Sequence, residues 1–343
     1  MKEKLILLLF GTTVGLAGAF LVYSVLMPNR EGVEFNNVDE FRAALKDPRA
    51  NGKYRRPDGS LPFVAVIEPH PSEDIIYTLR PGLHDNFTGV TVTTNSQGMR
   101  SPERPIVKPE GTYRIALMGD SFAFGWGVDQ DKSFAQVLED TLNERFKGSP
   151  KVEVLNFGIP GYSSFQEVAL FTERGLQFKP DAVLFFFVDN DFEFPFFIRD
   201  SSKPLGLVQS FSLGSWEKSK NPVVLAQRQA MIGRDPVSSF KKLDAVAKQE
   251  AIPAFIAVNP GRQPRGVMKR LSPLKRETEI RFVPLTKPFD TIVRERGYTP
   301  PELTLPNDPH PSVLCHRIYG TLLADGLEPT IEQSSGGGRG RPT

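Results

Sequence analysis

Short apolar runs and longer amphipathic stretches alternate along residues 112–326. The apolar runs are bounded by glycine, proline and other turn residues, and the continuous run 182–188 is typical of a strand buried on both faces. Strands are predicted at residues 113–118, 152–155, 182–188, 254–258 and 280–284. Because strands that alternate with helices form parallel sheets, the pattern predicts an α/β fold, a three-layer αβα sandwich with a parallel, flavodoxin-like sheet.

Helices are predicted where apolar residues recur at helical spacing after a capping residue. Ser133 with Gln136, and Ser164 with Glu167, fit the capping-box pattern that begins a helix. Further helices are predicted at about 238–249 and at about 311–325. In such a fold, the residues that carry chemistry lie in loops at the carboxyl ends of the strands.

Residues 5–27 form an apolar segment without a charged side chain. At a helical rise of about 1.5 Å per residue, the segment is long enough to cross the ~30 Å hydrocarbon core of a bilayer. Lys2 and Lys4 precede it, which predicts a single-pass anchor in the cytoplasmic membrane with the rest of the chain outside, in the periplasm. The alternative is a signal peptide cleaved at the small residues Ala17-Gly18-Ala19, which would cut the apolar segment in its middle.

The remaining segments are assigned from local composition. Residues 28–111 are expected to form a polar stalk and a small β-rich extension, with strand-prone runs at 63–67 and 90–94. Proline, glycine and serine break the βα pattern at about 192–235, which indicates an insertion in the 112–326 domain. Residues 327–343, which end in a glycine-rich stretch, are expected to be a disordered tail.

Composition narrows the class of protein. Hydrophobic residues make up 39% and charged residues 24% of the chain, as in globular proteins. The net charge of +2 and the lack of a basic, aromatic-rich stripe give no reason to expect a nucleic-acid partner. The single cysteine, Cys315, excludes an intramolecular disulfide and a Cys-x-x-Cys redox site. A metal site built from Asp308, His310, Cys315 and His316 is disfavoured, because the His-x5-His spacing does not match a helical pair.

Four short motifs in the 112–326 domain carry residue types suited to acyl transfer. They are, in chain order, Gly119-Asp120-Ser121, Asn156-Phe157-Gly158-Ile159-Pro160-Gly161, Asp189-Asn190-Asp191 and Asp308-Pro309-His310-Pro311-Ser312. The first three follow predicted strands, and the fourth precedes the last predicted helix. Each alone is typical of an ordinary turn or helix cap, but the loops of one parallel sheet converge at the same edge.

Together these motifs supply the groups that a serine hydrolase needs. A serine nucleophile requires a base that titrates near neutral pH and a carboxylate that orients the base, and Ser121, His310 and Asp308 fit these roles. Backbone N–H groups exposed by a glycine turn, and the amide of Asn190, suit a developing oxyanion.

The motifs resemble those of the SGNH (GDSL-type) hydrolase family over about residues 112–325. GDSF matches the nucleophile block, NFGIPG the glycine block, VDND the asparagine block and DPHPS the histidine block. The segment TNSQGMR at residues 94–100 also looks like one that precedes the core in bacterial membrane-linked members. Two positions depart from the family pattern: Val188 stands where glycine is usual, and Asn307 stands where the acid commonly lies.

The resemblance implies a role for each matching residue. Ser121 would be the nucleophile, His310 the base, and Asp308 the acid that orients the base. The oxyanion hole would consist of the backbone N–H groups of Ser121 and Gly161 and the side chain of Asn190. The second glycine of the glycine block is preferred to the first as the backbone donor. No cofactor or metal is implied.

The same resemblance implies a serine-dependent carboxyl-ester hydrolase that deacylates a carbohydrate or glycolipid, and the predicted anchor makes it extracytoplasmic. Two alternatives stay open: an O-acyltransferase acting on envelope polysaccharide, and a catalytically idle scaffold that binds polysaccharide. The expected partners are an acylated carbohydrate or other small ester, the inner membrane through residues 5–27, and envelope polysaccharide machinery.

Two aromatic features each have two interpretations. Trp126 follows the nucleophile block and either walls the substrate cleft or anchors the packing of the loop. The phenylalanines at 192–197 either pack in a core or lid, or line an acyl pocket or touch the membrane.

Overall fold

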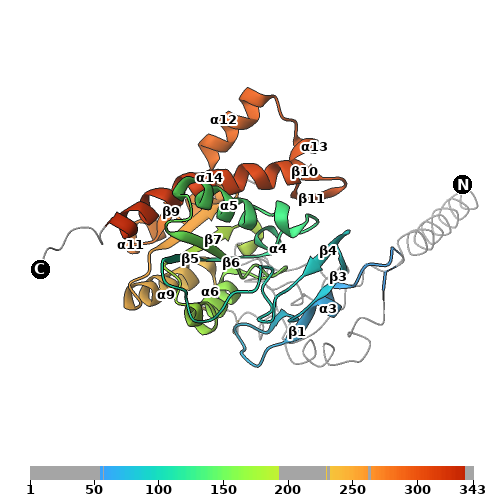
Figure 1. Cartoon of the computed structure of the whole chain (residues 1–343), viewed down its shortest axis with the longest axis horizontal. Helices are drawn as coiled ribbons and strands as arrows, with labels where there is room; N and C mark the ends of the chain where they lie inside the picture. The colour runs from blue at the N-terminus through green and yellow to red at the C-terminus, as the bar shows by residue number, and fades with distance from the viewer. Residues whose placement is uncertain (1–54, 57, 193–228, 230–231, 262–263, 337–343) are drawn as a thin grey trace, which may run out of the picture. The chain divides into compact units, whose positions relative to one another are not determined.

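The computed structural model describes residues 55–56, 58–192, 229, 232–261 and 264–336. Its core is a five-stranded, wholly parallel sheet with the strand order β6-β5-β7-β8-β9 (Figure 1). The strands are β5 (Thr112–Gly119), β6 (Lys151–Asn156), β7 (Ala182–Phe187), β8 (Ala254–Val258) and β9 (Arg281–Val283). Each of the five predicted apolar runs forms one of these strands, so the predicted α/β fold with a parallel sheet is confirmed.

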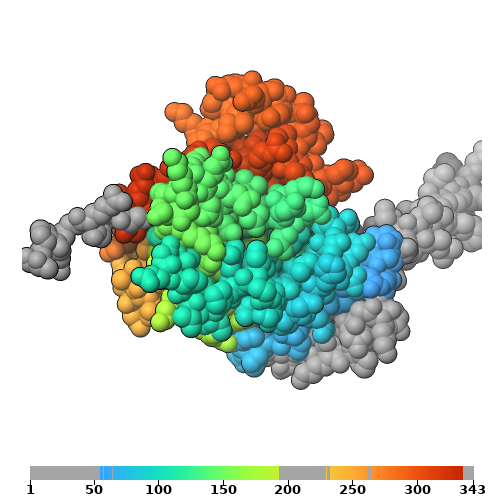
Figure 2. Space-filling view, in the orientation of Figure 1, coloured from blue at the N-terminus to red at the C-terminus, as the bar shows by residue number. Residues whose placement is uncertain are grey.

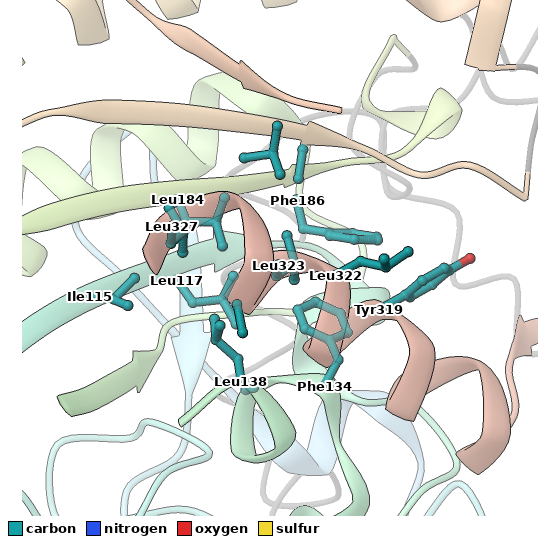
Figure 3. Close-up of a cluster of buried hydrophobic side chains, with 14 of the residues drawn as sticks. Ile115, Leu117, Phe134, Leu138, Leu184, Phe186, Tyr319, Leu322, Leu323 and Leu327 are labelled. Atoms are coloured by element: carbon teal, nitrogen blue, oxygen red, sulfur yellow. The ribbon is translucent and has the colours of Figure 1, made fainter. Parts of the chain in front are cut away.

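Helices cover both faces of this sheet. Alternate residues of a strand point to opposite faces, so the apolar strands present side chains to the helices on each side. The four main covering helices are α5 (Phe134–Phe146), α6 (Ser164–Glu173), α9 (Pro236–Gln249) and α14 (Val313–Gly336). Leu184 and Phe186 of β7 belong to a buried cluster that they share with side chains of α5 and α14 (Figure 3). Phe185, between them, packs edge-on against Phe171 of α6 and Phe240 of α9. The uninterrupted apolar sequence of β7 therefore reflects burial on two sides.

Residues 58–104, here called the N-terminal extension, form two small antiparallel hairpins. The strand β1 (Ile67–Pro69) pairs with β2 (Tyr77–Leu79), and β3 (His84–Phe87) pairs with β4 (Val90–Thr93). In the space-filling view the extension, blue to cyan, lies against the green residues that follow it (Figure 2).

The strand predicted at residues 63–67 is wrong for its first four residues, which form the helix α3 (Phe63–Val66). Ala65 and Val66 are buried, so the apolar character of this run comes from contact with the core. A short apolar run does not by its periodicity distinguish a buried helical turn from a strand.

The predicted capping box at the start of α6 is wrong by one residue. The N-cap is Ser163, and its backbone N–H donates to Oε1 of Gln166 (3.3 Å), so Ser164 and Glu167 are not the capping pair. Two adjacent serines allow either register, and in the structure the side chain of Gln166 completes the capping box with Ser163. The other predicted N-cap, Ser133, does cap α5.

The last helix is longer than predicted, and the predicted disordered tail is wrong for residues 327–336, which continue α14. Leu327 and Ile331 lie one helical turn apart and are both buried in the core cluster. This burial supports the final turns of α14 although Pro329 lies inside the helix. Residues 337–343 lie outside the described residues.

Several short elements were not predicted. They are α4 (Ser121–Phe124), α10 (Pro264–Arg270), α11 (Leu274–Glu277), α12 (Thr286–Arg296), α13 (Pro300–Leu303), β10 (Thr304–Leu305) and β11 (Asp308–Pro311). The last two pair as an antiparallel hairpin just before α14.

Three predicted segments cannot be compared with the structure. The anchor predicted at 5–27, residues 28–54 of the predicted stalk, and residues 193–228 and 230–231 of the insertion predicted at about 192–235 lie outside the described residues. Within the described part of the chain, no helix combines the length and the apolar character that a membrane span requires.

Candidate active site

The strand β5 ends in a tight turn that carries Ser121. A Cβ atom on Gly119 would lie 2.6 Å from Cβ of Ala123, so glycine lets the chain turn back on itself here. Asp120 is the N-cap of α4, and its Oδ1 accepts a hydrogen bond from the N–H of Phe122 (2.9 Å). Ser121 is therefore the first residue of a helix, and its own N–H makes no hydrogen bond to another described residue.

The hairpin of β10 and β11 brings Asp308 and His310 to Ser121 (Figure 1). Nε2 of His310 lies 2.8 Å from Oγ of Ser121. Oδ1 of Asp308 lies 2.5 Å from Nδ1 of His310 and also accepts the backbone N–H of His310 (2.9 Å). The structure thus joins the three residues in one hydrogen-bonded row.

Asn307 explains why the carboxylate stands two residues before the histidine. It occupies the hairpin turn with φ +58°, a left-handed conformation that asparagine adopts more readily than most residues. The next residue, Asp308, is then the one that reaches the imidazole of His310.

The carboxyl group of Asp308 favours its ionised form. Partial burial alone would raise its pKa, but the backbone N–H and ring of His310 outweigh this effect, and Trp126 adds a further hydrogen bond. The pKa of Asp308 consequently lies below its ordinary value.

Hydrogen bonds of the Asn156 side chain connect the glycine block to α4. Nδ2 of Asn156 donates to the carbonyl of Ala123 (2.8 Å), and its Oδ1 accepts the N–H of Gly158 (2.9 Å). A Cβ atom on Gly158 would lie 2.3 Å from the backbone nitrogen of Phe124. Gly158 therefore permits close packing against the nucleophile helix.

The two glycines of this block differ in what their N–H groups do. The N–H of Gly158 is taken by Asn156, whereas the N–H of Gly161, at φ +77°, makes no hydrogen bond within the described residues. Tyr77 of the N-terminal extension donates its hydroxyl to the carbonyl of Pro160 (2.9 Å), which holds the peptide next to Gly161.

Asn190 lies in a 3₁₀ turn, Asp189–Phe192, that follows β7. Its Nδ2 donates to Oδ2 of Asp120 (2.8 Å), so the asparagine block and the nucleophile block are joined by a direct hydrogen bond. Burial raises the pKa of Asp120, although the donors Phe122 and Asn190 oppose this rise. A primary amide has two N–H groups, so one N–H of Asn190 remains for a second acceptor.

Two more buried carboxyl groups lie close to this network. Glu167 of α6 and Asp191 are each 1% exposed, and Oδ2 of Asp191 accepts the N–H of Val188 (2.7 Å). Burial raises the pKa of both groups well above the ordinary value; the charges of Asp191 and Asp120 add to the rise for Glu167, and the charge of Asp120 adds to it for Asp191. Their positions in the sequence predict only a helix cap and a turn, because the burial of the two carboxyl groups is tertiary.

Two residues outside the four motifs contact the same site. Trp126 stacks on His310 and donates Nε1–H to Oδ2 of Asp308 (3.2 Å). Arg100 of the N-terminal extension donates to carbonyl oxygens of the segment that ends α4. In the sequence, Trp126 stands out only by its place after the nucleophile block, and Arg100 only as the last residue of TNSQGMR.

The disfavoured metal site is not assembled. The two ring nitrogens of His310 contact Ser121 and Asp308, and Nδ1 of His316 accepts the N–H of Phe134 (3.0 Å). In the part of the chain that the structure describes, no three histidine, cysteine or carboxylate side chains are grouped so that they could hold a metal ion.

Comparison with known proteins gives a family and several similar structures. The model of the GDSL-like lipase/acylhydrolase family matches residues 117–318. Comparison with curated proteins gives no significant match. The chain is similar to a lipase/acylhydrolase from Enterococcus faecalis, with 17% identity and a TM-score of 0.38 over 64% of this chain and 96% of that one. It is also similar to a family 3 carbohydrate esterase from Clostridium thermocellum, with 12% identity and a TM-score of 0.41 over 65% of this chain and 99% of that one.

The family match runs from β5 into α14 and spans more than half of the chain. It includes the nucleophile, glycine and asparagine blocks as well as the hairpin that carries His310. The chain therefore belongs to the GDSL-like lipase/acylhydrolase family and is a hydrolase of ester bonds.

Proposed function

We propose that this chain is a serine-dependent carboxyl-ester hydrolase in which Ser121, His310 and Asp308 form a catalytic triad. One observation carries the proposal: Nε2 of His310 lies 2.8 Å from Oγ of Ser121 while Nδ1 of the same ring faces Asp308. A serine bonded to a base, with the base oriented by an ionised carboxylate, is the arrangement that general-base activation of a nucleophile requires.

In the acylation step, Oγ of Ser121 attacks the acyl carbon of the ester and its proton passes to Nε2 of His310. The carbonyl oxygen becomes an oxyanion, and the N–H groups of Ser121 and Gly161 are proposed to bind it together with the second N–H of Asn190. Collapse of the intermediate breaks the bond to the alcohol. The alcohol leaves with the proton from His310, and the acyl group stays on Ser121.

In the deacylation step, water attacks the acyl carbon and gives a proton to His310. Collapse of the second intermediate releases the carboxylic acid, and the proton returns to Oγ of Ser121. Ionised Asp308 holds Nδ1–H and stabilises the imidazolium that forms in both steps.

The location and the substrate are proposed from sequence. The apolar residues 5–27 support an anchor that leaves the hydrolase domain outside the cytoplasm, where acylated carbohydrates and glycolipids are the expected esters. Incubation with purified envelope glycans should release acyl groups detectable by mass spectrometry, and intact glycans would contradict this substrate class.

The triad is tested on the full chain, purified in mild detergent, with p-nitrophenyl acetate and a fluorophosphonate probe. Ser121→Ala should lower kcat at least ~10³-fold and abolish labelling, because nothing else on α4 can serve as the nucleophile. The probe should map to the peptide that contains Ser121. Ser334→Ala, at an exposed serine of α14, is the matched control and should behave as wild type. Equal hydrolysis and equal labelling of wild type and Ser121→Ala would refute the proposal.

A further inference from the structure

Trp126 contacts both residues that assist Ser121 in the proposed triad. Its indole ring stacks on the imidazole of His310, with ring centroids 5.0 Å apart and 17° between the planes. Its Nε1–H donates to Oδ2 of Asp308 (3.2 Å), whereas the imidazole of His310 uses Oδ1. The side chain of Trp126 therefore contacts the ring face of His310 and the carboxylate oxygen of Asp308 that His310 does not use.

The backbone of Trp126 closes a ring of hydrogen bonds with the nucleophile. The N–H of Trp126 donates to the carbonyl of Ser121 (3.0 Å). Hydrogen bonds then run from Ser121 through His310 and Asp308 to the indole and back to Ser121. Ser121 and His310 are 189 positions apart in the chain, so Trp126 links the nucleophile turn to β11 by a route that avoids the reacting atoms.

Neighbouring residues fix the orientation of the indole. Gly127 has φ +70°, and a Cβ atom there would lie 2.3 Å from Cδ1 of Leu305 in β10, so the backbone is pressed against the hairpin. Phe87 of β3 packs edge-on against Trp126, with centroids 5.2 Å apart and 75° between the planes. The indole is thus packed between the N-terminal extension and the hairpin that carries the base.

We propose that Trp126 is a positioning residue for His310 and Asp308, an inference that rests on the triad proposed above. By binding Oδ2, the indole N–H fixes the rotation of the Asp308 carboxylate and keeps Oδ1 directed at the imidazole. The π face of the indole stabilises the positive charge that appears on His310 when it takes the serine proton. Both effects are strongest in the transition state, so they act on kcat more than on KM.

Two substitutions separate the hydrogen bond from the stacking. Trp126→Phe retains an aromatic face but has no N–H donor, and Trp126→Leu has neither. With the full chain and p-nitrophenyl acetate, kcat should fall about tenfold in Trp126→Phe and about a hundredfold in Trp126→Leu, with KM changed by no more than roughly twofold.

Each other kinetic outcome has a defined meaning. Wild-type kcat in Trp126→Leu would overturn the inference. A raised KM with wild-type kcat would also overturn it, because Trp126 would then line the substrate cleft. Ser121→Ala, assayed in parallel, distinguishes the two proposals: if that variant is as active as wild type, the triad itself fails.

A fluorescence measurement tests the stacking without turnover. The chain contains two tryptophans, so Trp216→Phe makes Trp126 the only source of indole emission. An imidazole stacked on an indole alters its fluorescence, so His310→Gln in the same background should change the emission of Trp126 at constant pH. Emission that is identical in the presence and absence of His310 would overturn the inference, even where Trp126→Leu fails to fold.

Discussion

Asp120 connects the nucleophile to the asparagine block through two different oxygens. Oδ1 accepts the N–H of Phe122 (2.9 Å), and Oδ2 accepts the amide of Asn190 (2.8 Å). Oγ of Ser121 is 3.5 Å from Oδ2 but only 2.8 Å from the imidazole of His310, so the imidazole is its stronger partner. Asp120 therefore acts as a helix cap and a support for Asn190, and Oγ of Ser121 is left to His310, the proposed base.

Asn190→Ala should lower kcat for p-nitrophenyl acetate by about 10²–10³-fold with little change in KM, because one proposed donor to the oxyanion is lost. The buried Asp120 also loses a donor, which should reduce the free energy of unfolding by roughly 1–3 kcal/mol. Steady-state kinetics and denaturant unfolding measure the two effects separately.

Asn143→Ala is the matched control for Asn190→Ala. The Asn143 amide donates to the carbonyls of Glu139 (2.9 Å) and Val152 (2.8 Å), away from the site, so its loss should destabilise the fold without lowering kcat. If the two variants had the same kcat, Asn190 would have no role in binding the oxyanion.

At the scale of elements, the N-terminal extension supports the end of α4. Arg100 is 2% exposed, and its guanidinium donates to the carbonyls of Phe124 (2.9 Å), Gly125 (2.5 Å) and Val128 (2.6 Å). Burial lowers the pKa of Arg100 to about 10, so the group stays charged at neutral pH. A buried cation at the C-terminal end of a helix satisfies carbonyl groups that the helix itself leaves without donors.

Arg100→Ala should reduce the free energy of unfolding by about 3 kcal/mol or more, because three buried carbonyl groups lose their donor. Arg100→Lys should fall between the alanine variant and wild type, since an ammonium group keeps the charge but lacks the planar fork. Denaturant unfolding measures both changes. Arg56→Ala, at an exposed arginine, is the control. A loss below about 1 kcal/mol in Arg100→Ala would show that the end of α4 does not depend on Arg100.

The elements that sequence predicted well are those whose signal is local. Each central strand is an apolar run covered on both faces, and Ser133 caps α5 as its position suggests. The last turns of α14 were missed, because Pro329 and the following glycines argue locally against a helix. Only the packing of Leu327 and Ile331 in the core supports those turns, and that contact is tertiary.

The residues of the candidate site also divide into those with a local sequence signal and those whose role depends on tertiary contacts. Ser121, Asn190 and His310 could be proposed because each lies in a recognisable motif at the end of a strand or before a helix. The role of Trp126 could not, because its contact with Asp308 joins positions 182 residues apart. The burial of Arg100 could not be predicted either, since nothing local shows that a charged residue is buried.

At the scale of the whole molecule, buried ionisable groups make the stability of the fold depend on pH, and different groups do so in opposite directions. Glu167 and Asp191 have raised pKa values in the folded state, so the folded chain holds protons that the unfolded chain releases. The stability that their protonated forms provide is complete below about pH 4 and is lost as the pH rises. His316 acts in the opposite sense, because its burial and the nearby charges of Arg100 and His310 lower its pKa to about 3.

The lowered pKa of His316 predicts how the stability of the fold changes in acid. Folded His316 stays neutral and accepts the N–H of Phe134, while the unfolded imidazole takes up a proton below about pH 6.5. The stability that neutral His316 provides is complete above pH ~6.5 and is lost as the pH falls toward 3. His316→Asn retains an acceptor near Phe134 but cannot titrate, so between pH 6.5 and 5 the free energy of unfolding of the wild type should fall by about 2 kcal/mol more than that of the variant.

Denaturant unfolding at both pH values measures the difference, and His84→Asn, at an exposed histidine of β3, is the matched control for removing an imidazole. Parallel pH profiles for wild type and His316→Asn would mean that the buried imidazole does not limit stability in acid.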